Sequence, residues 1–192
     1  MNRYELRLSG SGGQGLILAG IILGEAVSIY DNKNAVQTQS YGPEARGGAS
    51  RSEVIISNEE IDYPKIRKAD LLLAMSQEAY DTYINDLKEN GILVFDPLFV
   101  KINNKNSNKY IIYEIEATKI ALEKIGKKIF ANIVALGFIV GITNIVSIEA
   151  IKKSLIARAP KGTEESNLIA LEEGYKEAFR KKNIMGVKNE IV

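Results

Sequence analysis

The sequence contains no cysteine and no histidine among its 192 residues. Without cysteine, the chain has no disulfide, no thiolate nucleophile and no thiolate ligand for an iron–sulfur cluster. Without histidine, it lacks the commonest metal ligand and the commonest acid–base group near neutral pH, which excludes a Ser-His-Asp triad and a histidine-based zinc site. This composition favours a binding or subunit role over a self-contained enzyme.

Net charge and long apolar runs are also scarce. Twenty-five basic residues against 24 acidic ones give a net charge of +1, far from the strong basic field of a nucleic-acid or membrane-surface binder. The N-terminus has no apolar signal-peptide segment. The longest apolar stretch, Ile129 to Ile142, is interrupted by Asn132 and falls short of the roughly 20 residues that span a bilayer. We therefore expect a cytoplasmic protein that binds neither nucleic acid nor membrane.

The pattern of apolar residues predicts alternating strands and helices, followed by helices alone. Strands are expected at residues 4–8, 35–39, 52–56, 70–75, 92–95 and 110–115. Helices are expected at residues 16–28, 77–89, 117–125, 129–143, 148–158 and 164–181. Gly91 and Gly126 are expected to end helices, while Ser76, Ser147 and Thr163 are expected to cap their starts. The order predicts an α/β layered sandwich with a largely parallel sheet and a helical C-terminal third.

A glycine-rich segment, GSGGQG at residues 10–15, lies between the first predicted strand and the first predicted helix. Its glycines let the backbone approach an anion, and the helix N-terminus directs amide donors at it. A dinucleotide site also uses an acidic residue about 20 residues further on, and residues 35–39 contain none. We expect a phosphate or diphosphate here rather than NAD. The alternative is a tight turn that uses glycine for packing alone. The candidate binding residues are Ser11, Gly12, Gly13 and Gln14.

A second segment, SYGPEARGGASR at residues 40–51, is predicted to be a loop because it contains Pro43 and three glycines. Arg46 and Arg51 are suited to bidentate binding of a carboxylate or phosphate. We expect an ordered loop in which Arg46 is the candidate binding residue. A mobile surface loop with solvated arginines is the alternative.

A third segment, APKGTEE at residues 159–165, joins two predicted helices. The candidate binding residues Lys161, Gly162 and Thr163, together with the amides of the following helix, form a second potential anion site. An ordinary helix connection with a threonine cap is the alternative. The carboxylates elsewhere do not cluster at metal-ligand spacing, so no metal site is expected.

Four motifs in order resemble the gamma subunit of 2-oxoacid:ferredoxin oxidoreductases. They are GSGGQG at residues 10–15, SYGPEARGGASR at residues 40–51, AMSQEAY at residues 74–80 and PKGTEE at residues 160–165. The similarity runs from about Leu6 to Tyr175, and SYGPEARGG with AMSQEAY is most similar to the 2-oxoglutarate branch. The resemblance implies a single gamma-type domain of the pyruvate/ketoisovalerate oxidoreductase kind over residues 1–192.

The resemblance also implies a reaction. Such a complex converts 2-oxoglutarate, CoA and oxidised ferredoxin into succinyl-CoA, CO2 and reduced ferredoxin. Thiamine diphosphate, iron–sulfur clusters and magnesium belong to companion alpha, beta and, where present, delta subunits. The gamma chain alone would bind none of them and be catalytically inert, but would help to form the CoA and substrate cavity. Other readings are pyruvate or another 2-oxoacid as substrate, a stand-alone nucleotide-binding protein, or a purely structural adaptor.

Overall fold

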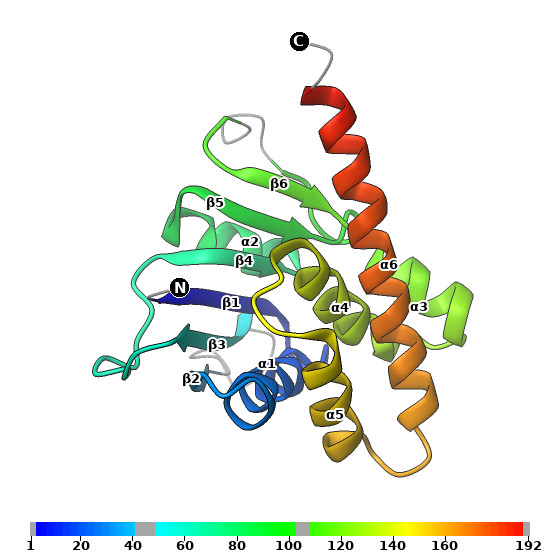
Figure 1. Cartoon of the computed structure of the whole chain (residues 1–192). Coiled ribbons are helices and arrows are strands. Elements are labelled where there is room, and N and C mark those ends of the chain that lie inside the picture. The colour runs from blue at the N-terminus through cyan, green and yellow to red at the C-terminus, as the bar shows by residue number, and fades with distance from the viewer. Residues whose placement is uncertain (1–2, 41–48, 103–107, 190–192) are drawn as a thin grey trace.

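A six-stranded sheet forms the centre of the computed structural model, which describes residues 3–40, 49–102 and 108–189 (Figure 1). The strands follow the order β2-β3-β1-β4-β5-β6 across the sheet. Only β3 is antiparallel to its neighbours, so the other five strands share one direction, and the predicted largely parallel sheet is confirmed. The strands are β1 (Tyr4–Ser11), β2 (Asn34–Ser40), β3 (Ala49–Ser57), β4 (Ala69–Ala74), β5 (Leu87–Phe95) and β6 (Ile111–Glu114).

Helices cover both faces of the sheet and fill the C-terminal third, as the sequence predicts (Figure 1). One face packs against α2, and the other packs against α1 and α4, with α6 outside α4. The helices are α1 (Leu16–Glu25), α2 (Gln77–Tyr83), α3 (Ala117–Ile125), α4 (Ala131–Thr143), α5 (Ile148–Arg158) and α6 (Glu164–Asn189). Within the described residues, every helix is too short or too polar to cross a lipid bilayer.

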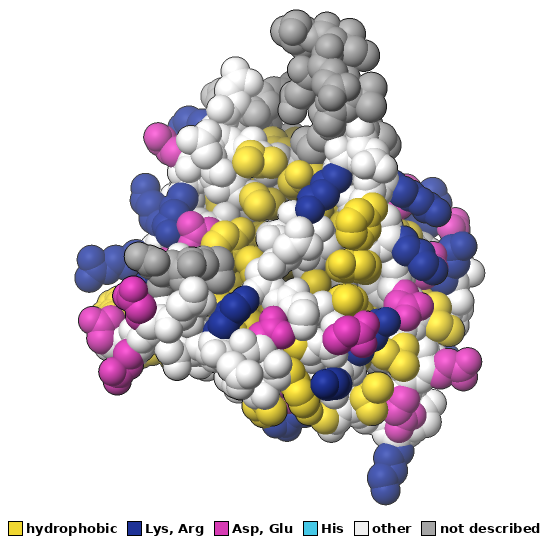
Figure 2. All heavy atoms as spheres, viewed as in Figure 1, with side chains coloured by type: hydrophobic (Ala, Val, Ile, Leu, Met, Phe, Trp, Pro, Cys, Tyr) yellow, Lys and Arg dark blue, Asp and Glu magenta, His cyan; other side chains and the backbone are white. Residues whose placement is uncertain are grey.

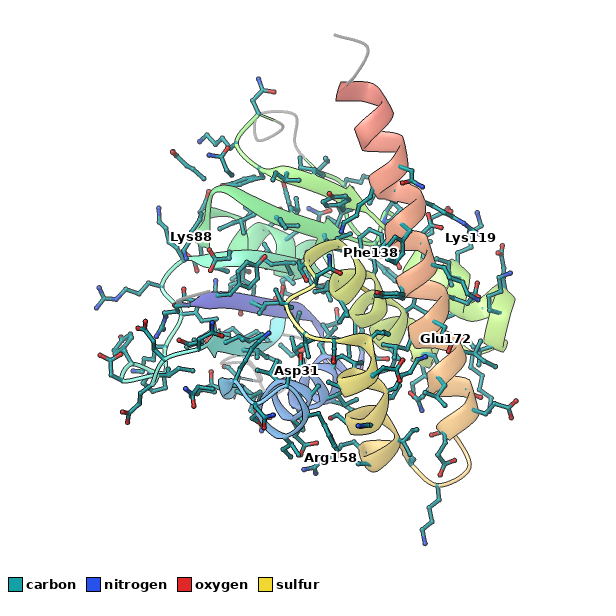
Figure 3. All side chains as sticks on the ribbon, viewed as in Figure 1. Asp31, Lys88, Lys119, Phe138, Arg158 and Glu172 are labelled. Atoms are coloured by element: carbon teal, nitrogen blue, oxygen red, sulfur yellow. The ribbon has the colours of Figure 1, made fainter. Side chains whose placement is uncertain are left out.

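Helix α4 lies between the sheet and α6 and is apolar on nearly every side because both sides are covered. Phe138 on α4 packs edge-on against Tyr113 of β6, with ring centroids 5.9 Å apart (Figure 3). A Cβ at Gly174 of α6 would overlap the carbonyl of Val134 on α4, so glycine is required for this close approach. Acidic and basic side chains are interspersed over the face of the molecule that Figure 2 shows.

Two predictions about the middle of the chain are wrong. The helix expected at residues 77–89 ends as an α-helix at Tyr83, continues as a short 3₁₀ turn, and gives way to β5 at Leu87. Gly91 therefore lies in a strand and caps no helix; a Cβ there would come within 2.8 Å of the Lys88 carbonyl. The loop expected at residues 40–51 is wrong at both ends, because Ser40 belongs to β2 and residues 49–51 pair with β1 and β2 as part of β3. Residues 41–48 lie outside the described residues.

The predicted helix boundaries that follow are largely confirmed. Gly126 ends α3 with a φ of 83°, the left-handed conformation that glycine adopts readily. The Ser147 hydroxyl accepts a hydrogen bond from the Ala150 amide at 3.2 Å and begins α5. Asp31 accepts from both the amide and the hydroxyl of Ser147 at 2.7 Å, and so fixes the turn after α1 to the start of α5 (Figure 3).

Stability at high pH should depend on Tyr4, at the start of β1. Burial and the nearby Asp70 carboxylate raise the pKa of the Tyr4 hydroxyl to about 12, whereas the unfolded chain loses this proton near pH 10. The folded state then holds a proton that the unfolded state has released, so the free energy of unfolding falls between about pH 10 and 12. Tyr4→Phe should remove this part of the loss in urea unfolding curves measured over that range. Identical pH slopes for the two proteins would contradict the assignment.

Candidate ligand-binding site

The glycine segment lies at the sheet edge where the parallel strands end. β1 ends at Ser11, its parallel neighbour β4 ends at Ala74, and β5, the next parallel strand beyond β4, ends at Phe95. The chain continues from β1 to β2 and β3 on one side, and then crosses to β4 on the other side of β1. In open α/β sheets, ligands bind in the crevice outside the carboxyl ends of the strands at such a switch point.

The glycine loop has a fixed conformation that leaves its tip open. Gly13 and Gly15 have φ values of 86° and 74°, which side chains disfavour. The Gln14 side chain fixes the loop: its oxygen accepts from the Ser11 amide at 2.8 Å, and its nitrogen donates to the Met75 carbonyl at 2.9 Å. Gly12 and Gly13 are exposed, and a Cβ built on either would meet no atom within 4 Å. Gln14 thus holds the loop while Gly12 and Gly13 leave room for a ligand.

A buried asparagine on α4 also holds this loop. Asn132 is 4% exposed, and its side-chain nitrogen donates to the Gly15 carbonyl at 2.9 Å. A Cβ at Gly15 would lie 2.5 Å from that nitrogen, so glycine is needed for the contact. Sequence reasoning did not include Asn132 in the site. The sequence signals Asn132 in one way only, as a polar residue inside the longest apolar run.

Three cavities border the loop, and the largest of the three has a volume of about 370 Å³. Among the described residues that line it, Lys128 is the one cation, and the apolar side chains Phe99 and Ile129 are 41% and 66% exposed at its rim. Exposed amides beside a lysine favour an anion at the loop, and apolar walls favour a ligand with an apolar part. The lining residues are Gly13, Gln14, Met75, Phe99, Thr118, Lys128, Ile129 and Ala131.

A second pocket, of about 180 Å³, brings two of the predicted segments together. Gly13 and Gly15 lie on one side of it, and Pro160 and Thr163 lie on the other. The Thr163 hydroxyl donates to the Pro160 carbonyl at 2.7 Å and accepts from the Asn167 amide nitrogen at 3.0 Å, so it stabilises the turn before α6.

The other two residues of the third segment lie outside these cavities. Lys161 and Gly162 are exposed and do not line either of them. Gly162 has a φ of 82°, which the turn between α5 and α6 requires.

The second predicted segment contributes differently. Arg46 lies outside the described residues. Arg51 lies on β3, where its guanidinium is 3.5 Å from the Glu53 carboxylate and lies over the Tyr83 ring. Arg51 therefore joins a charge cluster on the α2 side of the sheet, in which Arg7 is also paired with Glu53 at 2.8 Å.

The acidic residue at the end of β5 is committed to the fold. Asp96 is 1% exposed, and its two carboxylate oxygens accept from the amides of Leu98 at 3.0 Å and Thr118 at 2.8 Å. In the part of the chain that the structure describes, no three acidic side chains are grouped as a metal site would require. The site as built suits an anionic ligand held by backbone amides and Lys128.

Known proteins are similar to this chain along most of its length. A family model described as pyruvate ferredoxin/flavodoxin oxidoreductase matches residues 5–177. A 2-oxoglutarate synthase subunit KorC from Methanocaldococcus jannaschii is 54% identical over 176 residues, which cover 92% of this chain and 94% of that protein.

Solved structures agree with the fold. The gamma subunit of a keto/oxoacid ferredoxin oxidoreductase from Geobacter sulfurreducens superposes with a TM-score of 0.85 at 48% identity, covering 94% of this chain and 98% of that one. A 2-oxoglutarate:ferredoxin oxidoreductase from Magnetococcus marinus, solved with 2-oxoglutarate, coenzyme A and succinyl-CoA bound, has the same fold at a TM-score of 0.84 and 22% identity. That match covers 94% of this chain but 32% of the longer one.

Proposed function

This chain belongs to the pyruvate ferredoxin/flavodoxin oxidoreductase family, and from that premise we propose that it is the gamma subunit of a 2-oxoglutarate:ferredoxin oxidoreductase. The complex would convert 2-oxoglutarate, CoA and oxidised ferredoxin into succinyl-CoA, CO2 and reduced ferredoxin in the cytoplasm. In this proposal residues 1–192 form one gamma-type domain, and the 54% identity to a 2-oxoglutarate synthase subunit supports 2-oxoglutarate over pyruvate.

The observation that carries the proposal is the cavity beside the glycine loop. Gly13, an exposed residue that lines this cavity, offers its backbone amide, and Lys128 offers its ammonium, as donors to the phosphate groups of CoA. The cavity volume of about 370 Å³ is within the range of sites for drug-sized ligands, whereas CoA is longer than such ligands. The apolar rim at Phe99 and Ile129 is exposed in this chain. We infer that a companion subunit covers this rim and completes the site.

The residue types of this chain support the proposal that companion subunits carry the redox cofactors. Iron–sulfur clusters need thiolate or imidazole ligands, and this sequence has neither cysteine nor histidine. In this proposal thiamine diphosphate and magnesium also belong to the companion subunits. This chain's contribution is then to bind and orient the cosubstrate, and the companion alpha, beta and, where present, delta subunits supply electron transfer.

Reconstitution tests this assignment. The isolated chain should show no turnover with 2-oxoglutarate, CoA and an artificial electron acceptor, because it has no electron carrier of its own. Adding the companion subunits with thiamine diphosphate should give CoA-dependent acceptor reduction that is faster with 2-oxoglutarate than with pyruvate. Turnover by the chain alone, or a complex that prefers pyruvate, would reject the assignment.

A further inference from the structure

A tight turn at residues 97–100, called the rim turn below, follows β5 and forms part of the wall of the largest cavity. The amides of Phe99 and Val100 donate to the Asp96 carbonyl at 3.1 and 3.0 Å, and Val100 is 2% exposed. Leu98 and Phe99, between these anchors, are 64% and 41% exposed. The rim turn thus presents two large apolar side chains in a hydrogen-bonded conformation.

Asp96 fixes the beginning of the rim turn and joins it to α3. Its carboxylate is nearly buried, and the two oxygens accept from the Leu98 amide at 3.0 Å and from the Thr118 amide at 2.8 Å. Thr118 is the second residue of α3, where backbone amides have no partner within the helix. Glu116, just before the helix, provides no side-chain cap. Asp96 therefore caps α3 from the end of β5 and holds the rim turn with the same carboxylate.

Gln77 fixes the other end of the rim turn and joins it to α2. Its side-chain oxygen accepts from the Lys101 amide at 2.8 Å, and its side-chain nitrogen donates to the Lys101 carbonyl at 3.4 Å. Met75, two residues earlier, lines the largest cavity and accepts from the Gln14 side chain at 2.9 Å. Residues 75–77 therefore link the glycine loop, through Gln14, to the rim turn.

We propose that Asp96 and Gln77 are positioning residues, which hold the rim turn against α3 and α2 so that Phe99 keeps its place on the cavity wall. Phe99 and Thr118 line the same cavity but come from different elements, and the Asp96 carboxylate joins those two elements. Asp96 and Gln77 do not line this cavity themselves, so their effect on a ligand passes through the rim turn.

The consequence for binding follows from preorganisation. A ligand that meets an ordered wall does not have to order it, and so keeps more of its interaction free energy as affinity. Releasing the rim turn should therefore weaken binding without removing any group that touches the ligand. Naming this ligand as CoA rests on the function proposed above, whereas the hold on the rim turn does not.

A spin label on the full chain tests the hold on the rim turn directly. Because the sequence has no cysteine, Leu98→Cys creates a single site for a nitroxide on an exposed side chain. Asp96→Asn keeps the size of the side chain but leaves one acceptor oxygen for two amides. The electron paramagnetic resonance spectrum should therefore shift toward its mobile component in Asp96→Asn, and also in Gln77→Ala, which releases the other end.

Asp31→Asn is the matched control. Asp31 also accepts with both carboxylate oxygens from another element, the amide and hydroxyl of Ser147, at 2.7 Å each. It joins the turn after α1 to α5 and does not line the largest cavity. The label at residue 98 should therefore keep its wild-type spectrum in Asp31→Asn. Equal mobilisation by Asp31→Asn and Asp96→Asn would show general loosening and overturn the proposal.

Kinetics of the reconstituted complex give the second readout, without the label. Asp96→Asn and Gln77→Ala should each raise the KM for CoA about three- to tenfold and leave kcat within about twofold of the wild type. Asp31→Asn should leave the KM unchanged. A merely structural role would instead lower the amount of active complex, and hence the apparent kcat, at an unchanged KM.

The outcomes separate this inference from the proposed function. If neither Asp96→Asn nor Gln77→Ala mobilises the label, or if both keep the wild-type KM for CoA, the inference is overturned and the gamma-subunit role stands. If the wild-type complex does not use CoA, the proposed function fails, and the label alone decides whether the two residues hold the rim turn. Gln77 is only partly buried, so Gln77→Ala decides the question if Asp96→Asn does not fold.

Discussion

Arg7→Met is expected to lower the free energy of unfolding by about 3–5 kcal/mol, the usual cost of removing one partner from a buried ion pair. Arg7 is 3% exposed in the middle of β1. Its guanidinium lies 2.8 Å from the carboxylates of both Glu53 and Asp86, and 4.9 Å from the centre of the Tyr83 ring. One side chain thus ties β1, β3 and the turn after α2 together.

The expected loss of stability in Arg7→Met is large because the Glu53 carboxylate loses its nearest cation. Glu53 is 8% exposed, and without Arg7 its remaining cation is Arg51 at 3.5 Å, whose own side chain is 36% exposed. A carboxylate held away from water with a weaker partner is costly. Asp86 matters less, because its side chain is 49% exposed and water can replace the arginine.

Urea unfolding of three proteins tests this argument. Arg7→Met combined with Glu53→Met should recover most of the stability that Arg7→Met loses, because no charge then remains unpaired. Arg158→Met is the surface control: its pair with Glu25 joins α5 to α1, but the Arg158 side chain is 51% exposed, and such pairs contribute about 1 kcal/mol or less. Equal losses for Arg7→Met and Arg158→Met, or no recovery in the double variant, would show that the buried charge is not the cause.

This cluster illustrates what the sequence did not reveal. The alternation of Tyr4, Leu6 and Leu8 with Glu5 and Arg7 predicts a strand with one buried and one solvated face. The strand is correct, but both of its faces are buried, because α2 covers the side that carries Arg7. Buried charges look like solvated ones in a sequence, since only the tertiary structure brings their partners from β3 and the segment after α2.

The wrong helix at residues 77–89 has a related cause. The apolar spacing and Ser76 cap predict its start correctly, and the Ser76 hydroxyl accepts from the Ala79 amide at 3.2 Å. Its end depends on long-range contacts: Asp86 pairs with Arg7 of β1, and Leu87 begins the pairing with β4. Tertiary pairing outweighs helix propensity over these few residues.

The sequence indicates the separate segments of the candidate site, but not that the fold brings these segments together. The glycine loop and the turn before α6 were recognisable because glycines between regular elements have a local physical meaning. That the two share a pocket depends on the packing of α6 against α4, which no local pattern encodes. Asn132 was missed as a site residue for the same reason, since its partner Gly15 lies 117 positions away in the sequence.

Gly13→Val should weaken CoA binding by about a hundredfold, equivalent to roughly 3 kcal/mol. Gly13 has a φ of 86°, and a non-glycine residue in the left-handed region costs about 1–2 kcal/mol, with a β-branched side chain at the unfavourable end. A loop that relaxes away from this conformation redirects the amide at the tip, and one lost charge-assisted hydrogen bond to a phosphate accounts for about 1.5–3 kcal/mol. The new side chain would also occupy the open space next to both cavities.

Gly126→Val separates backbone strain from ligand binding. Gly126 has nearly the same φ, 83°, and equally open space around its Cα, but it ends α3 and lines neither cavity. Both variants should lose similar stability in thermal unfolding, while CoA affinity, measured by calorimetry on the full chain, should fall in Gly13→Val alone. If Gly13→Val binds CoA within about threefold of the wild type at the same loss of stability, the glycine loop is a packing turn and the CoA phosphates bind elsewhere. If both variants lose affinity equally, general destabilisation explains the result, because strain at the end of α3 reaches the site only through the fold.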